Sequence, residues 1–411
     1  MKNIKPIKKE TLDEVINGFI NSIQLDNKTY QQYLKSIAAK KNKLNNFISP
    51  GRSSNKNNEL VVLRRWNSNT PLLAEHQSAS NKGGGYFISY NDFGIVIDPG
   101  YNFIENFASA GYKLDDIDAI FITHAHDDHT MHLEGLFSML NKRRKYQGDP
   151  KKIDLYLNLG SFKKFSAIIN LSKGSTTPFI NKIVLLNAHQ NISINDDIGL
   201  FTTHAKHDEN ITLDYSLGFT FVFNKRLTTG KRILKFTSDT AWNTDNEKIN
   251  YEQFSEYYIE KPNILICHLG SITENEINDY DIKKSLVENE IHLYDNHLGL
   301  IGTLAEIEKW DPEITLVSEF GLELEHIRID LVKLLSNHLK KFVFPVDLNF
   351  RINIDSLEIL SHKSRRYFSC DQLSYSENKD NSIVYYNSLT DFDAADIGNI
   401  GAAALEVKPF I

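Results

Sequence analysis

The sequence has few cysteines and no long apolar run. Its two cysteines among 411 residues, Cys267 and Cys370, argue against a disulfide framework and for a reducing compartment. No apolar stretch approaches the ~18 residues that a membrane-spanning helix needs. The Lys-rich segment 1–10 lacks the apolar core of a signal peptide. We therefore expect a cytoplasmic protein that does not associate with a membrane.

The chain also lacks a positive net charge. It carries 46 Lys and Arg against 53 Asp and Glu, which gives a formal net charge of −7. This balance disfavours tight, sequence-independent binding to long nucleic-acid duplexes, although it is compatible with a local basic groove. The 41% hydrophobic and 24% charged residues are typical of a globular protein. The length accommodates two domains, or one large domain with extensions.

A dense cluster of histidine and aspartate stands out at residues 124–129, which read His-Ala-His-Asp-Asp-His. It follows an apolar run, 117–123, that predicts a buried strand, and it precedes a helical pattern at 132–140. The cluster is therefore predicted to lie where a strand ends and a helix begins. In α/β proteins, ligands usually bind in the crevice at such positions.

The spacing within this cluster suits metal binding. His124 and His126 are two residues apart in an extended segment, so both imidazoles can face one metal ion. Asp128 and His129 follow at the turn into the helix and can reach a second ion beside the first. Imidazole and carboxylate are ligands for zinc, manganese or iron. The alternative is a polar loop in which Asp127 or Asp128 caps the helix, but a cap accounts for only one aspartate.

The cluster, together with Gly-Ile-Val-Ile-Asp-Pro-Gly at residues 94–100, resembles the metallo-β-lactamase-fold hydrolases. The resemblance covers roughly residues 60–345. It implies an α/β fold, the four-layer αββα sandwich, in which two sheets pack face to face with helices outside. We expect a helical extension and linker at 1–58, the hydrolase domain at 59–345, and a β-rich extension at 346–411.

The resemblance further implies a complete set of ligands for two divalent metal ions, with zinc favoured and manganese or iron as alternatives. The set comprises His124, His126 and His207 for one ion, Asp128, His129 and His297 for the other, and Asp239 as the bridge. The local pattern at Asp239-Thr240 is typical of the ribonuclease Z-like phosphodiesterase branch.

Two ligand positions have competitors nearby in the sequence. His204 lies three residues before His207, and His292 lies five residues before His297. The later histidine of each pair matches the family pattern better. Asp98 is implied to support the histidine loop from behind the metal site, and the alternative for it is an aspartate in a turn.

Two residues are expected to take part in catalysis. Asp128 would orient a hydroxide shared by the two metal ions. His268 follows the predicted strand 264–267 and is the candidate to protonate the leaving oxygen. It resembles the histidine of a His-Glu-Ala-Thr motif in ribonuclease Z-like enzymes, but here the letters are His-Leu-Gly-Ser, so the match is partial. The alternative is a histidine that hydrogen-bonds a neighbouring loop.

These residues predict metal-assisted hydrolysis. The favoured substrate is a phosphodiester in a nucleotide, a cyclic nucleotide or a short single-stranded nucleic acid. One alternative is hydrolysis of a lactone, thioester or β-lactam, and another is a catalytically silent nucleotide-binding protein of the same fold. Glu319 stands where tRNA-processing ribonuclease Z enzymes carry a histidine, which argues against tRNA as the substrate.

The outer parts of the chain give weaker signals. Apolar residues at helical spacing up to about residue 46 predict N-terminal helices. These either pack on the main domain, which we favour, or mediate dimerisation or partner docking; a homodimer is expected. The basic run 142–145 favours a solvated helix end over a phosphate contact. The pattern also predicts a long helix over 322–342, and strands between 349 and 386.

Overall fold

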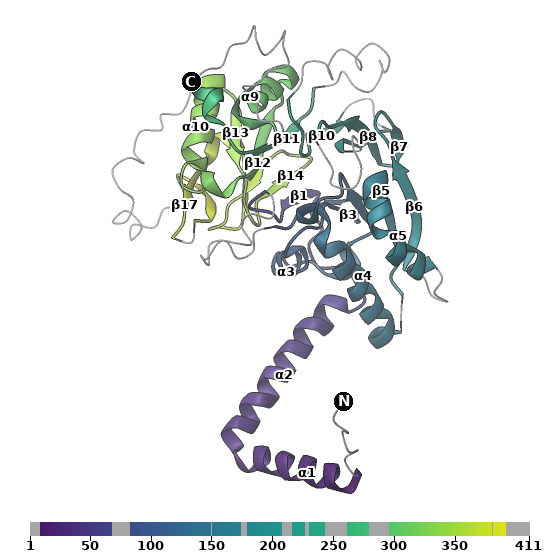
Figure 1. The fold of residues 1–411 in the computed structure, drawn as a ribbon. Helices are drawn as coiled ribbons and strands as arrows, with labels where there is room; N and C mark the ends of the chain where they lie inside the picture. Colours follow the sequence, from purple (N-terminus) through teal and green to yellow (C-terminus); the bar gives the residue numbers. More distant parts are fainter. Residues whose placement is uncertain are drawn as a thin grey trace.

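The computed structural model describes residues 9–67, 83–148, 150–173, 179–207, 216–226, 230–242, 261–278, 296–379 and 381–391. Within these residues the chain forms two large β-sheets that face each other, with helices on the outer side of each (Figure 1). The four-layer αββα sandwich expected from the sequence is thereby confirmed. No described helix is both long and apolar enough to cross a membrane.

The first sheet has nine strands among the described residues, in the order β16-β15-β14-β1-β2-β3-β4-β5-β6. Strands β1, β2 and β3 are antiparallel neighbours, and β3 to β6 run parallel. Their bounds in chain order are β1 Glu59–Val62, β2 Tyr86–Tyr90, β3 Phe93–Ile97, β4 Ala119–Ile122, β5 Ile153–Asn158, β6 Ile180–Leu186, β14 Arg351–Asn353, β15 Ile359–Leu360 and β16 Tyr367–Phe368. Because β14 pairs with β1, strands β14 to β16 extend the first sheet of the sandwich.

The second sheet has seven strands in the described part of the chain, in the order β13-β12-β11-β10-β9-β8-β7. Strands β10 to β13 run parallel, and β7 to β10 are antiparallel. Their bounds are β7 Asn191–Ser193, β8 Ile198–His204, β9 Leu217–Phe223, β10 Arg232–Phe236, β11 Ile264–Gly270, β12 Ile314–Phe320 and β13 Phe342–Pro345. A separate hairpin consists of β17 Leu373–Glu377 and β18 Ile383–Asn387.

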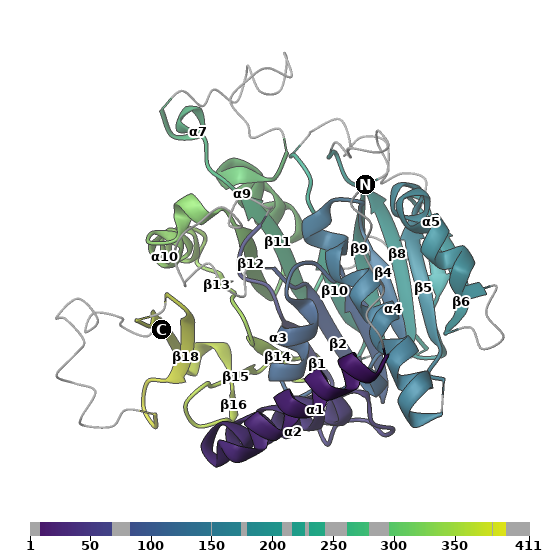
Figure 2. The ribbon, with the colours of Figure 1, turned by 60° about the horizontal axis from the view of Figure 1, so that its bottom comes forward.

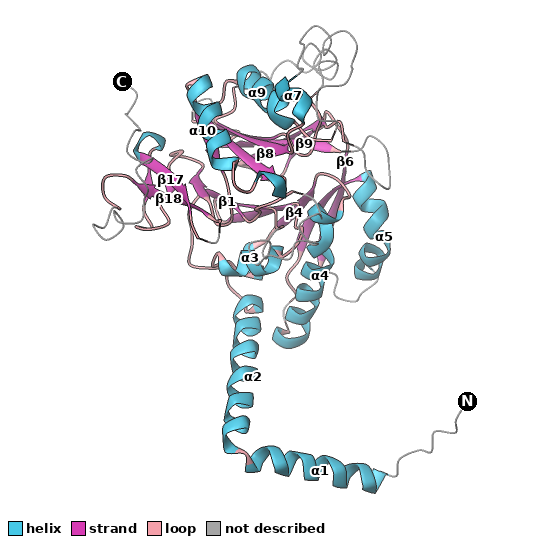
Figure 3. Ribbon diagram, turned by 60° about the vertical axis from the view of Figure 1, so that its left-hand side comes forward, coloured by secondary structure: helices cyan, strands magenta, loops and turns pink. Residues whose placement is uncertain are grey.

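Helices cover the outer faces of both sheets. Figure 3 shows α3, α4 and α5 on the side of the first sheet, and α9 and α10 on the side of the second. The α-helices are α1 Lys9–Leu25, α2 Asn27–Ile48, α3 Phe103–Ser109, α4 Asp127–Gln147, α5 Leu159–Lys173, α7 Glu274–Asn278, α9 Gly299–Trp310 and α10 Arg328–Leu339. The short 3₁₀ turns are η3 Leu114–Asp116, η4 Leu322–Leu324 and η5 Cys370–Gln372.

Strand β4 is an uninterrupted run of apolar residues because both of its faces are buried. In β4, Ala119 and Phe121 belong to the core between the sheets, whereas Ile120 and Ile122 belong to the core under the helices. The ring of Phe121 stacks on that of Tyr156, with centroids 4.1 Å apart. The strand that leads into the histidine cluster is therefore fixed on both faces.

Two sequence-based expectations are wrong. The predicted helix over 322–342 is instead the turn η4, a helix that begins only at Arg328, and the strand β13 that begins at Phe342. Phe342 to Pro345 pair parallel with β12, so tertiary pairing overrides the helical spacing of the apolar residues. The N-terminal helices do not pack along the main domain. Only the end of α2, at Phe47 and Ile48, is buried, and the rest projects outward (Figures 1 and 3). In Figure 2 the same helices point toward the viewer.

Candidate metal centre

The candidate ligands come from segments that follow strand ends in both sheets. His124 and His126 follow β4 in the first sheet, His207 follows β8 in the second, and Asp239 follows β10. Because the sheets face each other, these ends meet at one edge of the sandwich, where the crevice of an α/β fold lies. His129 lies in the first turn of α4, and His297 precedes α9.

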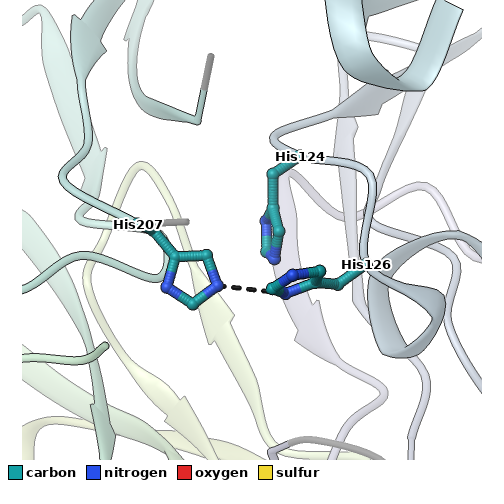
Figure 4. A group of neighbouring side chains, drawn as sticks. All are labelled: His124, His126 and His207. Carbon is teal, nitrogen blue, oxygen red and sulfur yellow. Dashed lines mark hydrogen bonds between the residues drawn. The ribbon is translucent and has the colours of Figure 1, made fainter. Parts of the chain in front are cut away.

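Three histidines form the first group of candidate ligands (Figure 4). One ring nitrogen each of His124, His126 and His207 lies within 4.8 Å of the others, and Nε2 of His207 is 3.0 Å from Nδ1 of His126. His124 is fully buried, and its Nε2 has no hydrogen-bond partner among the described residues. A buried nitrogen without a partner, facing two further imidazoles, fits a metal ligand.

Carboxylates dominate the second group. Asp128, His129, Asp239 and Glu319 each place one candidate ligand atom within 4.8 Å of the others. Oδ2 of Asp239 is 3.1 Å from Nε2 of His129 and 3.1 Å from Nε2 of His297. The same oxygen is 3.8 Å from Nε2 of His124, in the first group. Asp239 thus lies between the two groups, where a bridging ligand is expected.

The structure brings together all seven ligands named from the sequence. The competitor His204 is not in either group. It is the last residue of β8, paired with Leu217 of β9, whereas His207 reaches His126. The other competitor, His292, lies outside the described residues.

Asp98 holds the histidine loop from behind. Its Oδ1 accepts a hydrogen bond from the backbone N–H of Thr123 at 2.8 Å, and its Oδ2 accepts one from the Thr123 hydroxyl at 2.7 Å. Oδ2 is also 3.0 Å from Nδ1 of His129. A carboxylate on one ring nitrogen orients the imidazole and leaves the other nitrogen for a metal. These contacts match the supporting role that the resemblance implied.

His268 is enclosed by protein groups. Its Nδ1 lies 2.9 Å from Oδ1 of Asp239 and 3.0 Å from Oε1 of Glu319, and its Nε2 lies 3.1 Å from the hydroxyl of Tyr86. Burial alone would lower the pKa of His268, but the carboxylates of Glu319 and Asp239 raise it to about 9. These contacts favour a group that orients Asp239. Its role as proton donor to the leaving oxygen stays a prediction.

Arg64 lies beside the second group, and it was not among the residues predicted from the sequence. Its side chain is fully buried, with Nη2 2.7 Å from Oδ2 of Asp128 and 3.2 Å from Oε2 of Glu319. No signal marked it, since an arginine after a strand is usually exposed. Glu319 drew notice only as the replacement for a histidine, and its pairing with Arg64 explains how a carboxylate can be buried there.

The pKa shifts of the first group and of Asp239 favour the protonation states that bind metal ions. Burial, together with neighbouring imidazoles, lowers the pKa of His124 well below its ordinary value and that of His126 to about 4. Burial also lowers the pKa of His207. Burial alone would raise the pKa of Asp239, but His129 and His297 hold it well below its ordinary value. The neutral imidazole and the ionised carboxylate are the forms that bind metal ions.

The basic run 142–145 lies far from this centre. It belongs to the last turns of α4, whereas Asp128 lies in the first turn. The 15 residues from Asp128 to Arg143 correspond to about 22 Å along a helix. Arg143 is buried and pairs with Asp115. The phosphate-contact interpretation of this run is therefore wrong for the metal centre. The run does lie at a helix end, as favoured, but Arg143 within it is buried and not solvated.

Comparisons with known proteins agree with this location. The family model described as "Anti-Pycsar protein Apyc1" matches residues 77–261, a span that contains six of the seven candidate ligands and excludes His297. No curated protein is significantly similar to the chain.

Several solved structures are similar in fold. The metallo-beta-lactamase fold protein YhfI from Bacillus subtilis is 12% identical, with 71% of this chain and 98% of that chain covered and a TM-score of 0.48. Human tRNase Z, short form, is 14% identical, with coverages of 72% and 99% and a TM-score of 0.47. A diphosphatase from the PhnP family is 14% identical, with coverages of 74% and 97% and a TM-score of 0.48.

Metal content tests the choice between two histidines. We expect the protein to hold two divalent ions per chain, and His207→Ala to lose at least one of them, because Nε2 of His207 faces the other two imidazoles. The matched variant His204→Ala is expected to keep both ions. Elemental analysis after dialysis against a weak chelator measures the stoichiometry. Loss of metal from His204→Ala but not from His207→Ala would contradict the assignment.

Arg64 provides a second test. Arg64→Met leaves Asp128 and Glu319 buried without their cation, a change that costs about 3–5 kcal/mol of stability. Bound divalent ions supply positive charge at the same place, so we expect the loss in melting temperature to be larger in chelator than with zinc. The control Arg65→Met breaks a buried pair with Asp347, and its loss should not depend on metal. Equal losses for Arg64→Met in both conditions would refute this electrostatic role.

Proposed function

We propose that this chain is a metal-dependent hydrolase that cleaves phosphodiester bonds in small nucleotides, with cyclic nucleotides as its substrate class. The observation that carries the proposal is that seven histidine and aspartate side chains form two adjoining groups, one of which contains the unpartnered Nε2 of His124, and that Asp239 lies between them. The substrate class is supported by the family model that matches residues 77–261, since that family degrades cyclic nucleotides.

The donor atoms fit two divalent cations. His124, His126 and His207 offer three nitrogens on one side, and the carboxylate-rich group lies on the other side of Asp239. Mixed imidazole and carboxylate sets of this kind suit zinc, manganese or iron, and we propose zinc. Bound there, two such ions would supply Lewis acidity and would lower the pKa of water enough for hydrolysis at neutral pH.

The side chains around the centre have separate tasks in this proposal. Asp128 is held by Arg64 through its Oδ2 and is placed to orient an attacking water by accepting its proton in a hydrogen bond. His268 fixes Asp239 through its Nδ1. Glu319 is fully buried between Arg64 and His268, so it shapes the centre from inside and does not face a substrate. The net charge of −7 is consistent with a small substrate instead of a long duplex.

Turnover assays test the proposed reaction. With zinc or manganese present, we expect hydrolysis of bis-p-nitrophenyl phosphate and of cyclic mononucleotides, and a loss of at least about 10³-fold in kcat/KM for Asp239→Asn, in line with the removal of a metal-bridging group. The control His204→Ala should retain wild-type activity. Turnover of lactones or thioesters alone would contradict the phosphodiesterase proposal, and tight nucleotide binding without turnover in any metal would contradict catalysis.

Substrates with different leaving groups distinguish two possible roles of His268, proton donor and orienting group. A proton donor matters for a poor leaving group such as a ribose hydroxyl and hardly at all for p-nitrophenolate. Because both ring nitrogens face protein groups, we expect His268→Asn to lower kcat by a similar factor on a cyclic nucleotide and on bis-p-nitrophenyl phosphate. A loss confined to the cyclic nucleotide, with unchanged metal content, would instead establish His268 as the proton donor.

A further inference from the structure

The N-terminal helices carry an apolar surface that faces solvent. Every residue of α1 whose side chain is described is exposed except Ile23, and so is every residue of α2 from 27 to 43 except Tyr30. Figure 1 shows both helices extending away from the sandwich, with α1 lying crosswise at the end of α2. The large apolar side chains exposed on them are Leu12, Val15, Ile16, Phe19, Ile20, Tyr33, Leu34 and Ile37.

The apolar residues follow the spacing of a helix-pairing seam. In α1 the positions 12, 16, 19 and 23 are four, three and four residues apart, and in α2 the positions 30, 34 and 37 continue the same alternation. Helices of this length with a water-exposed apolar face are marginal in isolation, because most helical stability in proteins comes from burying that face. A partner helix is therefore expected on each seam.

One chain cannot supply that partner by folding α1 back onto α2. A single residue, Asp26, separates the two helices. Its carboxylate accepts hydrogen bonds from the backbone N–H and the hydroxyl of Thr29, at 3.3 Å and 2.6 Å, and so caps α2. Antiparallel helices are usually joined by loops of about two to five residues. The capped one-residue corner holds the helices apart, so the seam partner must come from another molecule.

The charges of the two helices are complementary. The first half of α1 carries Glu10, Asp13 and Glu14, whereas α2 carries five lysines and no acidic residue. The three acidic residues lie 12 to 16 residues before Asp26, and Lys40, Lys41 and Lys43 lie 14 to 17 residues after it. At ~1.5 Å per residue the two sets are nearly the same distance from the corner. An α1 laid antiparallel along the α2 of another copy therefore meets charges of opposite sign.

We propose that two copies of this chain associate through these helices, with α1 of each copy lying antiparallel along α2 of the other. A two-fold axis that bisects the corner at Asp26 places α1 of each copy along α2 of the other. One rotation therefore pairs the apolar faces of both helices. The association uses the projecting helices alone. It holds whatever reaction the metal centre performs.

The oligomeric state of the full-length chain tests the seam. In sedimentation velocity or light scattering at micromolar concentrations, we expect the wild type to be a dimer and Phe19→Asp to be a monomer. The matched control is Leu334→Asp in α10, since Leu334 is 67% exposed and Phe19 is 66% exposed. This control should remain a dimer. A monomeric wild type, or a Phe19→Asp variant that still dimerises, overturns the proposal.

Charge exchange tests which helices pair. One variant carries Lys40→Glu, Lys41→Glu and Lys43→Glu, and the other carries Glu10→Lys, Asp13→Lys and Glu14→Lys. Each variant alone should dimerise at least tenfold more weakly than the wild type, and an equimolar mixture should restore wild-type association as a mixed dimer. Failure of the mixture to pair overturns the exchange of helices. A monomeric wild type that binds anionic phosphatidylserine vesicles, with binding lost in Phe19→Asp, would show that a membrane occupies the seam instead.

Discussion

The contacts of Asp239 join the two halves of the sandwich at the metal centre. Its carboxylate is almost fully buried, and it comes from the second sheet. One oxygen lies close to His129 from the first half and to His297 from the second, and the other faces His268. A buried carboxylate is stable only where positive charge and hydrogen-bond donors surround it. The convergence of histidines from both halves meets that requirement, and cations bound among them would meet it further.

Arg64 and Glu319 also compensate buried charges, behind the second group of candidate ligands. Arg64 faces two carboxylates at once, Asp128 and Glu319, and Glu319 in turn contacts His268. Removal of one charged side chain would leave its partner's charge buried without a counter-charge. The resulting loss of folding stability is larger than the net stability that the intact pair contributes. The network therefore fixes the ligand carboxylates in place before any metal binds. This arrangement is consistent with a preorganised hydrolytic centre.

The projecting helices and the metal centre differ in the interactions on which they depend. The centre depends on buried charge and strand ends that are held on both faces by apolar cores. The helices depend on exposed apolar seams and opposite charges, and they are tied to the body through the buried end of α2 at Phe47 and Ile48. The proposed association through the helices would therefore be independent of the candidate ligands, because the two use separate parts of the chain.

The sequence by itself determined what is local. The spacing of two between His124 and His126 and the apolar strand before them sufficed for the first ligands, because such signals depend on neighbouring residues. The fold class followed from the resemblance of the motifs at 94–100 and 124–129 to a known family. Tertiary structure decided the rest. Arg64 meets Asp128 across 64 residues and His268 meets Tyr86 across 182, and no local pattern encodes such pairs. The position of His207 and the strand that begins at Phe342 were likewise settled by contacts between distant segments, which the local spacing of residues does not encode.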